Sequence, residues 1–276
     1  MLGGQAHWGA FFSSFRKRHL RCFLLYNIYI FLDKDCFMNK TEKAEILEKS
    51  KIWFKTSIME QHQVNTRKLT SIKEFNVNPF LASYLAHFLT GNAKPESIAK
   101  ALIYPRVLGT SINTMFGTGI QKFATDVLSS FASTTSGMDI EFDDVLDGSH
   151  KYCQLKAGPN TINKDDVETI FRHFKSVKDL ARTNSKKIGI DDLIVGVIYG
   201  TPEELSGHYK RLNKDYDIPV LVGKDFWYHL TGEENFYFEL IKAIGSVVSE
   251  SNFKDELNDV IHQLSLTKEI IEISES

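Results

Sequence analysis

The chain has 276 residues, of which 42% are hydrophobic and 25% are charged, and its formal net charge is −2. This is the composition of an ordinary globular protein, and it excludes a globally basic nucleic-acid-binding protein, so any such surface has to be a local patch. The three cysteines, Cys22, Cys36 and Cys153, form no CxxC pair. We therefore expect neither a disulfide framework nor a cysteine zinc site, and a cytoplasmic location fits best.

Residues 1–37 differ from the rest of the chain. A basic cluster over residues 16–21 precedes an apolar run over residues 22–32, which is about half the ~20 residues that span a bilayer. Three interpretations stay open: a spurious extension of a chain that naturally begins at Met38, an accessory amphipathic segment packed on the domain, or a membrane signal. We expect residues 38–276 to form a single domain.

The first part of that domain is predicted to be helical. Residues 41–60 have helical spacing with Thr41 as a plausible cap, and further helices over 69–104 begin at Ser71 or Asn78 and at Pro95. One of them carries apolar residues at i, i+4 spacing, which are Phe80, Leu81, Tyr84, Leu85, Phe88 and Leu89. The helix that starts at Pro95 is expected to end before Pro105.

A loop and another helix are expected next. Gly109 predicts the loop, and Ser111 caps a helix over residues 112–131.

From residue 138 the apolar period changes to two. Residues 138–143 alternate apolar and acidic side chains, Asp147-Gly148 predicts a turn, and residues 150–157 form a second strand. The remaining elements are a helix capped by Asn163, buried strands over 193–199 and 218–222, and helices over 224–249 and 253–271. This order predicts an α/β fold with a mixed central β-sheet flanked by helices, and with helical N-terminal and C-terminal parts.

Polar residues gather on the first two predicted strands. Asp139 lies on the polar face of one strand, and Gln154 and Lys156, two residues apart, share a face of the next. Between them Leu155 turns its side chain inward and leaves its carbonyl as a candidate metal ligand. Mg²⁺ prefers oxygen ligands, and phosphodiester hydrolysis uses such an ion together with a cation that steers water. The pattern therefore indicates phosphodiester chemistry.

Two short motifs resemble the signature of the PD-(D/E)XK nucleases. They are Gly137-Met138-Asp139 and, after a gap of fourteen residues, Gln154-Leu155-Lys156, with methionine in place of the family's proline and glutamine in place of its second acid. The resemblance implies that Asp139 binds Mg²⁺, that Gln154 binds the metal or orients its water, and that Lys156 positions the attacking water and offsets developing charge. Asp139, Gln154 and Lys156 are thus the predicted catalytic residues.

The stretch from Gln154 to Asn163 is also similar to type II restriction endonucleases that cut GGNCC-like sites. This resemblance extends over roughly residues 80–250, with a catalytic core at about 106–250. Because the amide of Gln154 brings no charge, another acid has to be considered. The candidates are Glu141 and Asp143, and, on the helix before the first strand, Gln121 and Asp126.

The helix after the second strand holds the candidates for DNA binding. Asn163 and Lys164 are nearest to the predicted site. Arg172 and Lys175 begin a basic stripe, continued by Lys178 and Arg182, that either follows DNA phosphates or is simply a solvated helix face. The aromatic residues over 226–228 are expected in the core.

We therefore predict an Mg²⁺-dependent, sequence-specific endonuclease that cuts double-stranded DNA, namely a type II restriction enzyme. A palindromic site mirrors two-fold symmetry, so a homodimer is expected. No membrane contact is expected, and a cognate DNA methyltransferase is expected in the same restriction–modification system but not as a binding partner. Two alternatives stay open: a structure-specific repair nuclease with the same core, and an inactive nuclease-like module that binds DNA or a protein.

Overall fold

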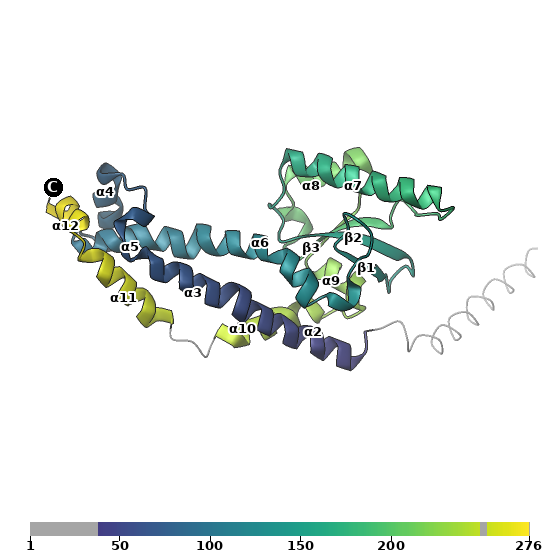
Figure 1. The fold of residues 1–276 in the computed structure, drawn as a ribbon, viewed down its shortest axis with the longest axis horizontal. Coiled ribbons are helices and arrows are strands. Elements are labelled where there is room, and N and C mark those ends of the chain that lie inside the picture. The colour runs from purple at the N-terminus through teal and green to yellow at the C-terminus, as the bar shows by residue number, and fades with distance from the viewer. Residues whose placement is uncertain (1–37, 249–252, 276) are drawn as a thin grey trace, which may run out of the picture.

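The computed structural model describes residues 38–248 and 253–275, and it contains a four-stranded β-sheet with helices on both faces (Figure 1). The predictions for residues 1–37 lie outside the described residues. The strands are β1 (Ile140–Asp143), β2 (His150–Lys156), β3 (Leu193–Val197) and β4 (Val220–Val222). They lie in the order β1-β2-β3-β4, with β1 antiparallel to β2 and the other two pairs parallel. The predicted mixed sheet is confirmed.

Two crossover helices cover one face of the sheet. They are α7 (Lys164–Thr183), between β2 and β3, and α8 (Gly207–Tyr216), between β3 and β4. α7 begins where predicted because the Asn163 side chain accepts the N–H groups of Asp165 and Asp166, and the Asp166 carboxylate accepts the N–H of Asn163. Its buried residues recur every three or four positions: Val167, Ile170, Phe174, Val177 and Ala181.

Four other helices pack on the opposite face. They are α2 (Lys40–Trp53), α6 (Ser111–Asp126), α9 (Lys224–Thr231) and α10 (Phe236–Val248). Phe226 and Trp227 lie fully inside this core, as expected, and the Trp227 indole N–H donates to the Ile198 carbonyl at 2.9 Å. The helical region predicted over 224–249 is divided into α9 and α10, because Gly232 takes a left-handed conformation (φ 72°) that ends α9.

Two long helices connect the sheet with the rest of the molecule. One continues from α2 through the π-helical segment η1 (Phe54–Met59) into α3 (Glu60–Arg67). The other continues from α5 (Pro95–Pro105) through the π-helical segment η4 (Arg106–Thr110) into α6. The residues that flank both π segments keep right-handed helical backbone angles, so each helix is unbroken.

The second long helix overturns the loop that the sequence predicts around Gly109. It also overturns the expected end before Pro105, since that proline lies inside α5. A proline in a helix lacks an N–H and crowds the preceding turn. The wider turn of η4 follows Pro105 directly and accommodates the missing bond without ending the helix.

A separate hydrophobic core lies at the end of the long helices away from the sheet (Figure 1). It is built mainly from α4 (Pro79–Thr90), α5, α11 (Phe253–Ser265) and α12 (Lys268–Glu275). The Asn78 cap of α4 is confirmed, but the buried residues of α4 are Ala82 and Ala86. The large apolar residues of this helix face solvent instead: Phe80, Leu81, Tyr84, Leu85, Phe88 and Leu89.

The turn between β1 and β2 is fixed by a buried charge network. Asp144 is almost fully buried, lies 2.6 Å from Nδ1 of His229 on α9, and is 3.8 Å from the Lys151 ammonium. Lys151 donates to Asp147 at 2.7 Å and to the Asp191 carbonyl at 3.0 Å. Buried charges are tolerated when they are paired in this way. The network sets the register of the hairpin and so brings the start of β1 beside the end of β2.

Short 3₁₀ turns complete the connections, at η2 (Lys68–Thr70), η3 (Ile72–Glu74), η5 (Ser129–Phe131) and η6 (Pro202–Glu204). None of the described helices combines the length and the apolar composition needed to cross a bilayer.

Candidate active site

Asp139 stands directly before β1. Its backbone N–H donates to the Cys153 carbonyl at 2.9 Å, which joins the start of β1 to β2. One carboxylate oxygen accepts the N–H of Leu155 at 2.7 Å, and the other accepts the side-chain amide of Gln121 on α6 at 3.2 Å. Each oxygen keeps a free lone pair. The carboxylate is therefore oriented by two donors and can still bind a ligand.

The backbone of Leu155 faces the same edge of the sheet. Along β2, the Lys156 carbonyl accepts the Ile198 N–H on the side of β3, whereas the Cys153 carbonyl accepts the Asp139 N–H on the side of β1. The backbone N–H and carbonyl groups of successive strand residues point to alternate sides of the strand. Both groups of Leu155 therefore point to the side of β1, at a level where β1 has not yet begun. The N–H meets Asp139, and no described strand residue lies opposite the carbonyl. That carbonyl is thus available beside the carboxylate.

Gln154 is almost completely buried, with 6% of its surface exposed. Its amide nitrogen donates to the Gly137 carbonyl and lies 2.7 Å from Nδ1 of His173 on α7. The amide is therefore held on its nitrogen side by the segment before β1 and by the crossover helix.

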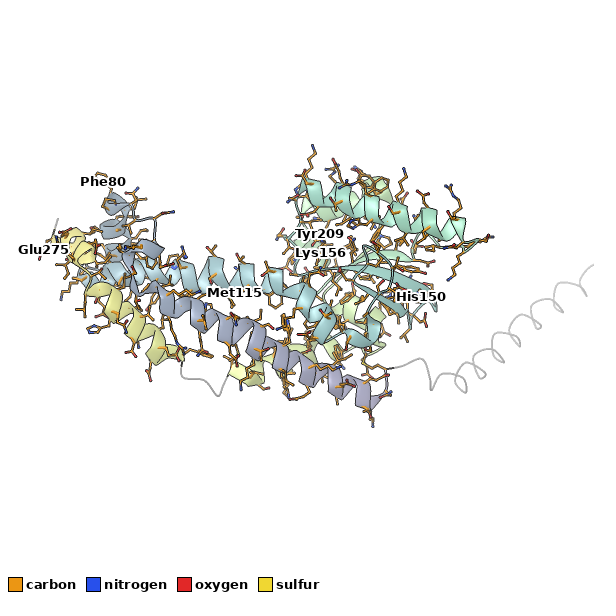
Figure 2. The ribbon with its side chains drawn as sticks, in the orientation of Figure 1. Phe80, Met115, His150, Lys156, Tyr209 and Glu275 are labelled. Carbon is orange, nitrogen blue, oxygen red and sulfur yellow. The ribbon has the colours of Figure 1, made fainter. Side chains whose placement is uncertain are left out.

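Lys156 ends β2, at the opposite end of the strand from His150 (Figure 2). Its side chain lines a pocket of about 290 Å³. Within the described parts of the chain, no residue holds the Lys156 ammonium in a hydrogen bond or ion pair. The pocket is lined by residues of α6, β2, α7 and the segment before β1: Gln121, Gly137, Met138, Asp139, Gln154, Lys156, Asp166, Thr169, Ile170 and His173.

Of the four residues considered as an additional metal ligand, only one lines the pocket. Gln121 lines the pocket, but Asp126 lies outside it, 3.9 Å from Lys122. Glu141 and Asp143 are also outside the pocket, since both contact His150, at 3.2 and 2.8 Å. They belong to the other end of the β1–β2 hairpin.

Glu141 and His150 perturb each other's protonation. Burial raises the pKa of Glu141, but hydrogen bonds from Ser133, Thr135 and His150 outweigh burial and lower the pKa below its ordinary value. Burial lowers the pKa of His150, but its contacts with Asp143 and Glu141 outweigh burial and raise the pKa. The ion pair is a feature of the hairpin rather than of the pocket.

None of the four predicted DNA-binding residues lines the pocket. The Asn163 side chain caps α7, and Arg172 donates to Thr169 at 3.1 Å. Lys164 and Lys175 are exposed. These residues lie near the site along the chain, but on other faces of α7.

Three pocket residues on α7 are missing from the sequence predictions: Asp166, Thr169 and His173. With Ile170 they have the spacing i, i+3, i+4, i+7, which marks one face of a helix. α7 starts beyond the end of β2, where Lys156 lies, so its first turns lie over that end of the sheet. Helical spacing combined with the crossover could have located them.

The donor atoms of the pocket fit Mg²⁺. Among the pocket residues of the described chain, the carboxylates are Asp139 and Asp166, and Asp166 is partly engaged in capping α7. Uncharged oxygens are available from the Leu155 carbonyl and the Gln154 amide. One or two carboxylates with neutral oxygens and water is the donor set that Mg²⁺ commonly takes near a phosphate.

The sheet, and the pocket formed by an aspartate before one strand and a Gln-x-Lys pair on the next, have the arrangement of the PD-(D/E)XK nuclease class. The model of the family described as type II restriction endonuclease EcoO109I matches residues 49–252. The chain belongs to this family, and the matched range includes the whole sheet and every residue of the pocket. No curated protein gives a significant match to the chain.

Proposed function

We propose that this chain is an Mg²⁺-dependent endonuclease that hydrolyses phosphodiester bonds of double-stranded DNA at a specific sequence, as a type II restriction enzyme. One observation carries the proposal: a single pocket contains an oriented carboxylate, a side-chain amide and an ammonium without a partner among the described residues, and the Leu155 carbonyl lies at the same edge of the sheet. These are the groups that hydrolysis of a phosphodiester requires.

Each residue of the site has its own proposed role in phosphodiester hydrolysis. Asp139, the Leu155 carbonyl and the Gln154 amide oxygen would hold Mg²⁺, which neutralises charge on the scissile phosphate and makes a bound water more acidic. Lys156 would direct the attacking water and offset the charge that develops on the phosphate. The N–H of Leu155 and the amide of Gln121 keep the Asp139 carboxylate in place before DNA arrives.

Asp139→Asn tests the proposal because it keeps the size of the side chain and removes its charge. We expect cleavage of phage DNA to fall by at least about 100-fold, with DNA binding in a gel-shift assay preserved. Asp139→Ala should behave alike. Asp126→Asn, an acid on α6 outside the pocket, is the matched control and should cut normally. Near-normal turnover by Asp139→Asn would show that the pocket is not the active site.

The same assay separates the alternatives. Discrete DNA fragments that appear only with Mg²⁺ indicate restriction, whereas cutting confined to branched or damaged DNA indicates a repair nuclease. DNA binding without cutting at any Mg²⁺ concentration indicates an inactive module. Lys156, which has no partner among the residues that the structure describes, favours an active enzyme, because a binding module has no need of a free ammonium inside this pocket.

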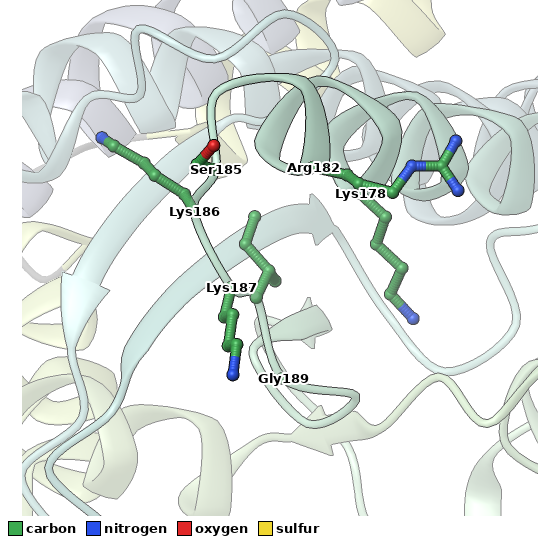
Figure 3. A pocket seen from close by; sticks show the side chains of 7 residues that line it. Lys178, Arg182, Ser185, Lys186, Lys187 and Gly189 are labelled. Carbon is green, nitrogen blue, oxygen red and sulfur yellow. The ribbon is translucent and has the colours of Figure 1, made fainter.

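For DNA binding, we propose the basic surface at the C-terminal end of α7. A pocket of about 600 Å³ there is lined by Lys178, Arg182, Ser185, Lys186, Lys187, Ile188 and Gly189 (Figure 3). Arg182 is paired with Asp179 at 3.4 Å, but the three lysines have no charged partner within the described chain. In a protein with a net charge near zero, such a local excess of cations is suited to DNA phosphates.

We also propose that two copies act together, with the exposed apolar face of α4 as the contact between them. The described part of one chain contains one candidate catalytic pocket, around Asp139 and Lys156, and cutting both strands of a symmetric site takes two. Phe80 and Phe88 are 89% and 79% exposed, and four further large apolar side chains share the helix. At roughly 150–200 Å² per side chain, their exposed parts sum to on the order of 600 Å². That approaches the ~800 Å² that each partner buries in a standard interface.

A further inference from the structure

Gln154 is held in a way that the proposed roles of Asp139 and Lys156 do not explain. A primary amide nitrogen has two N–H groups. Here one is directed to the Gly137 carbonyl and the other to Nδ1 of His173, at 2.7 Å. Both partners are acceptors in this arrangement. An exchange of the nitrogen and oxygen of the amide would place an oxygen against the Gly137 carbonyl, so a single orientation is favoured.

The amide oxygen is then directed away from these two partners. It accepts no hydrogen bond from any residue that the structure describes, and it is not among the enclosed polar atoms without a partner. Because Gln154 lines the pocket, this oxygen is available there, beside Asp139.

His173 and Gly137 are fitted to each other. Gly137 has a φ of +84°, and a side-chain carbon at this position would lie 3.1 Å from the His173 ring. Glycine is therefore favoured at residue 137 both by its backbone angle and by the approach of the ring. This close approach allows one amide nitrogen to reach both acceptors.

We propose that His173 is a positioning residue: through Nδ1 it orients the Gln154 amide so that the amide oxygen serves in place of the carboxylate of other PD-(D/E)XK sites. This inference rests on the proposed function, because it assumes that the pocket binds a divalent cation. The inference also gives a functional role to His173, which lies outside both signature motifs.

The test measures binding of Mn²⁺ alone to the full chain, from the electron paramagnetic resonance signal of free Mn²⁺, alongside DNA cleavage over an Mg²⁺ titration. His173→Phe keeps a ring but removes the acceptor, and we expect it to weaken Mn²⁺ binding by about 10-fold or more. Half-maximal cleavage should need a correspondingly higher Mg²⁺ concentration. His173→Asn offers an oxygen near the position of Nδ1 and should restore most of the affinity. His262→Phe, at an exposed site on α11, is the control and should bind Mn²⁺ normally.

The outcomes are distinct. Unchanged Mn²⁺ affinity in His173→Phe would overturn the inference, as would a change only in the DNA concentration needed for cleavage, which would make His173 a DNA contact. Equal defects in His173→Phe and His173→Asn would also overturn it, since the acceptor would then be irrelevant. If Asp139→Asn itself bound Mn²⁺ normally, the proposed function would fail instead. Because His173 is exposed, the variants should fold; His173→Ala gives the same comparison if phenylalanine is not tolerated beside Gly137.

Discussion

At the scale of single residues, glutamine at position 154 removes the negative charge that the acid of the PD-(D/E)XK signature would bring, while the side chain keeps nearly the same shape. Glutamine and glutamate have nearly the same size, but only the amide can donate to Gly137 and His173. The negative charge of the metal site then comes mainly from Asp139. A substitution series at positions 154 and 156 can therefore separate charge, hydrogen bonding and space.

We expect Gln154→Glu to retain cleavage and to lower the Mg²⁺ concentration for half-maximal activity, because it adds a charged ligand. It should also lower the free energy of unfolding by about 1–3 kcal/mol, because a carboxylate oxygen then faces the Gly137 carbonyl. Gln154→Leu should cut far more slowly, and Lys156→Met should be the most damaging of the three, since it removes the cation of the pocket. Cleavage across an Mg²⁺ titration and denaturant unfolding give the two readouts. Wild-type behaviour of Gln154→Leu at every Mg²⁺ concentration would make Gln154 a bystander.

The sequence was sufficient to place Gln154 and Lys156 on one face, because side chains alternate along a strand, and the resemblance to the nuclease signature added Asp139 to them. It did not indicate His173, Asp166 or Thr169. Their contact with β2 depends on how α7 lies over the end of the sheet, and neither motif spacing nor strand alternation contains that information. The site residues themselves stay predictions until the variants are measured.

At the scale of elements, the β1–β2 hairpin should give the protein a pH-dependent stability. The pKa of His150 is raised in the folded state by Asp143 and Glu141, so its contribution is full below its unfolded pKa of 6.5 and is lost as the pH rises through the folded pKa. The pKa of Glu141 is lowered, so its contribution is lost at acidic pH. Between about pH 6 and pH 9, His150→Leu should lose less stability than the wild type. Denaturant midpoints over this range are the measurement, and an equal slope for His150→Leu and the wild type would contradict the assignment.

The C-terminal end of α7 makes a separate prediction about DNA. If its lysines neutralise phosphates, Lys186→Ala combined with Lys187→Ala should reduce the slope of log affinity against log salt by about 2. Lys55→Ala combined with Lys73→Ala removes the same charge from other exposed positions and should leave the slope unchanged. Equal slopes for both double variants would assign DNA binding to another surface.

Most helices and strands could be predicted from the sequence, but the π-helical segments that connect consecutive helices could not. β1 and β2 follow from alternation, β3 and β4 from continuous apolar runs, and the start of α7 from capping chemistry at Asn163. The π segment η4 does not, because a glycine and a proline within a few residues ordinarily signal a break. Here burial of both end regions of the helix, in the core at the far end and in the core under the sheet, outweighs the local preference at Pro105 and Gly109.

At the scale of the whole molecule, the exposed face of α4 predicts self-association. Introducing charge with Phe80→Lys and Phe88→Lys should convert a dimer to a monomer in size-exclusion chromatography with light scattering, because a buried unpaired lysine is costly. Leu180→Lys, at an exposed position on α7, should remain dimeric. A monomeric wild type, or a dimeric double variant, would contradict the assignment of this face.

This face illustrates what a periodic pattern leaves open. The i, i+4 spacing of the large apolar residues correctly indicates a helix, yet the buried side of α4 is its alanines. The small residues allow α4 to approach α5 closely, and this leaves the bulky ones outside. Spacing identifies a helical stripe but not the surface that covers it.

The two unbroken helices, 40–67 and 95–126, have a consequence for how the protein unfolds. The first begins in the core under the sheet, with Ile46, Trp53 and Ile58, and ends just before Leu69 of the core at the far end. The second begins in that far core, with Ile98 and Ile103, and reaches the core under the sheet at Ile120. There is consequently no flexible linker in either helix at which one core could melt while the other persists. Heat should unfold both cores in a single cooperative transition, and a protease should find no early cut within either helix. A destabilising change near α4, remote from the pocket, would then reduce the amount of active enzyme without altering the chemistry of any molecule that remains folded.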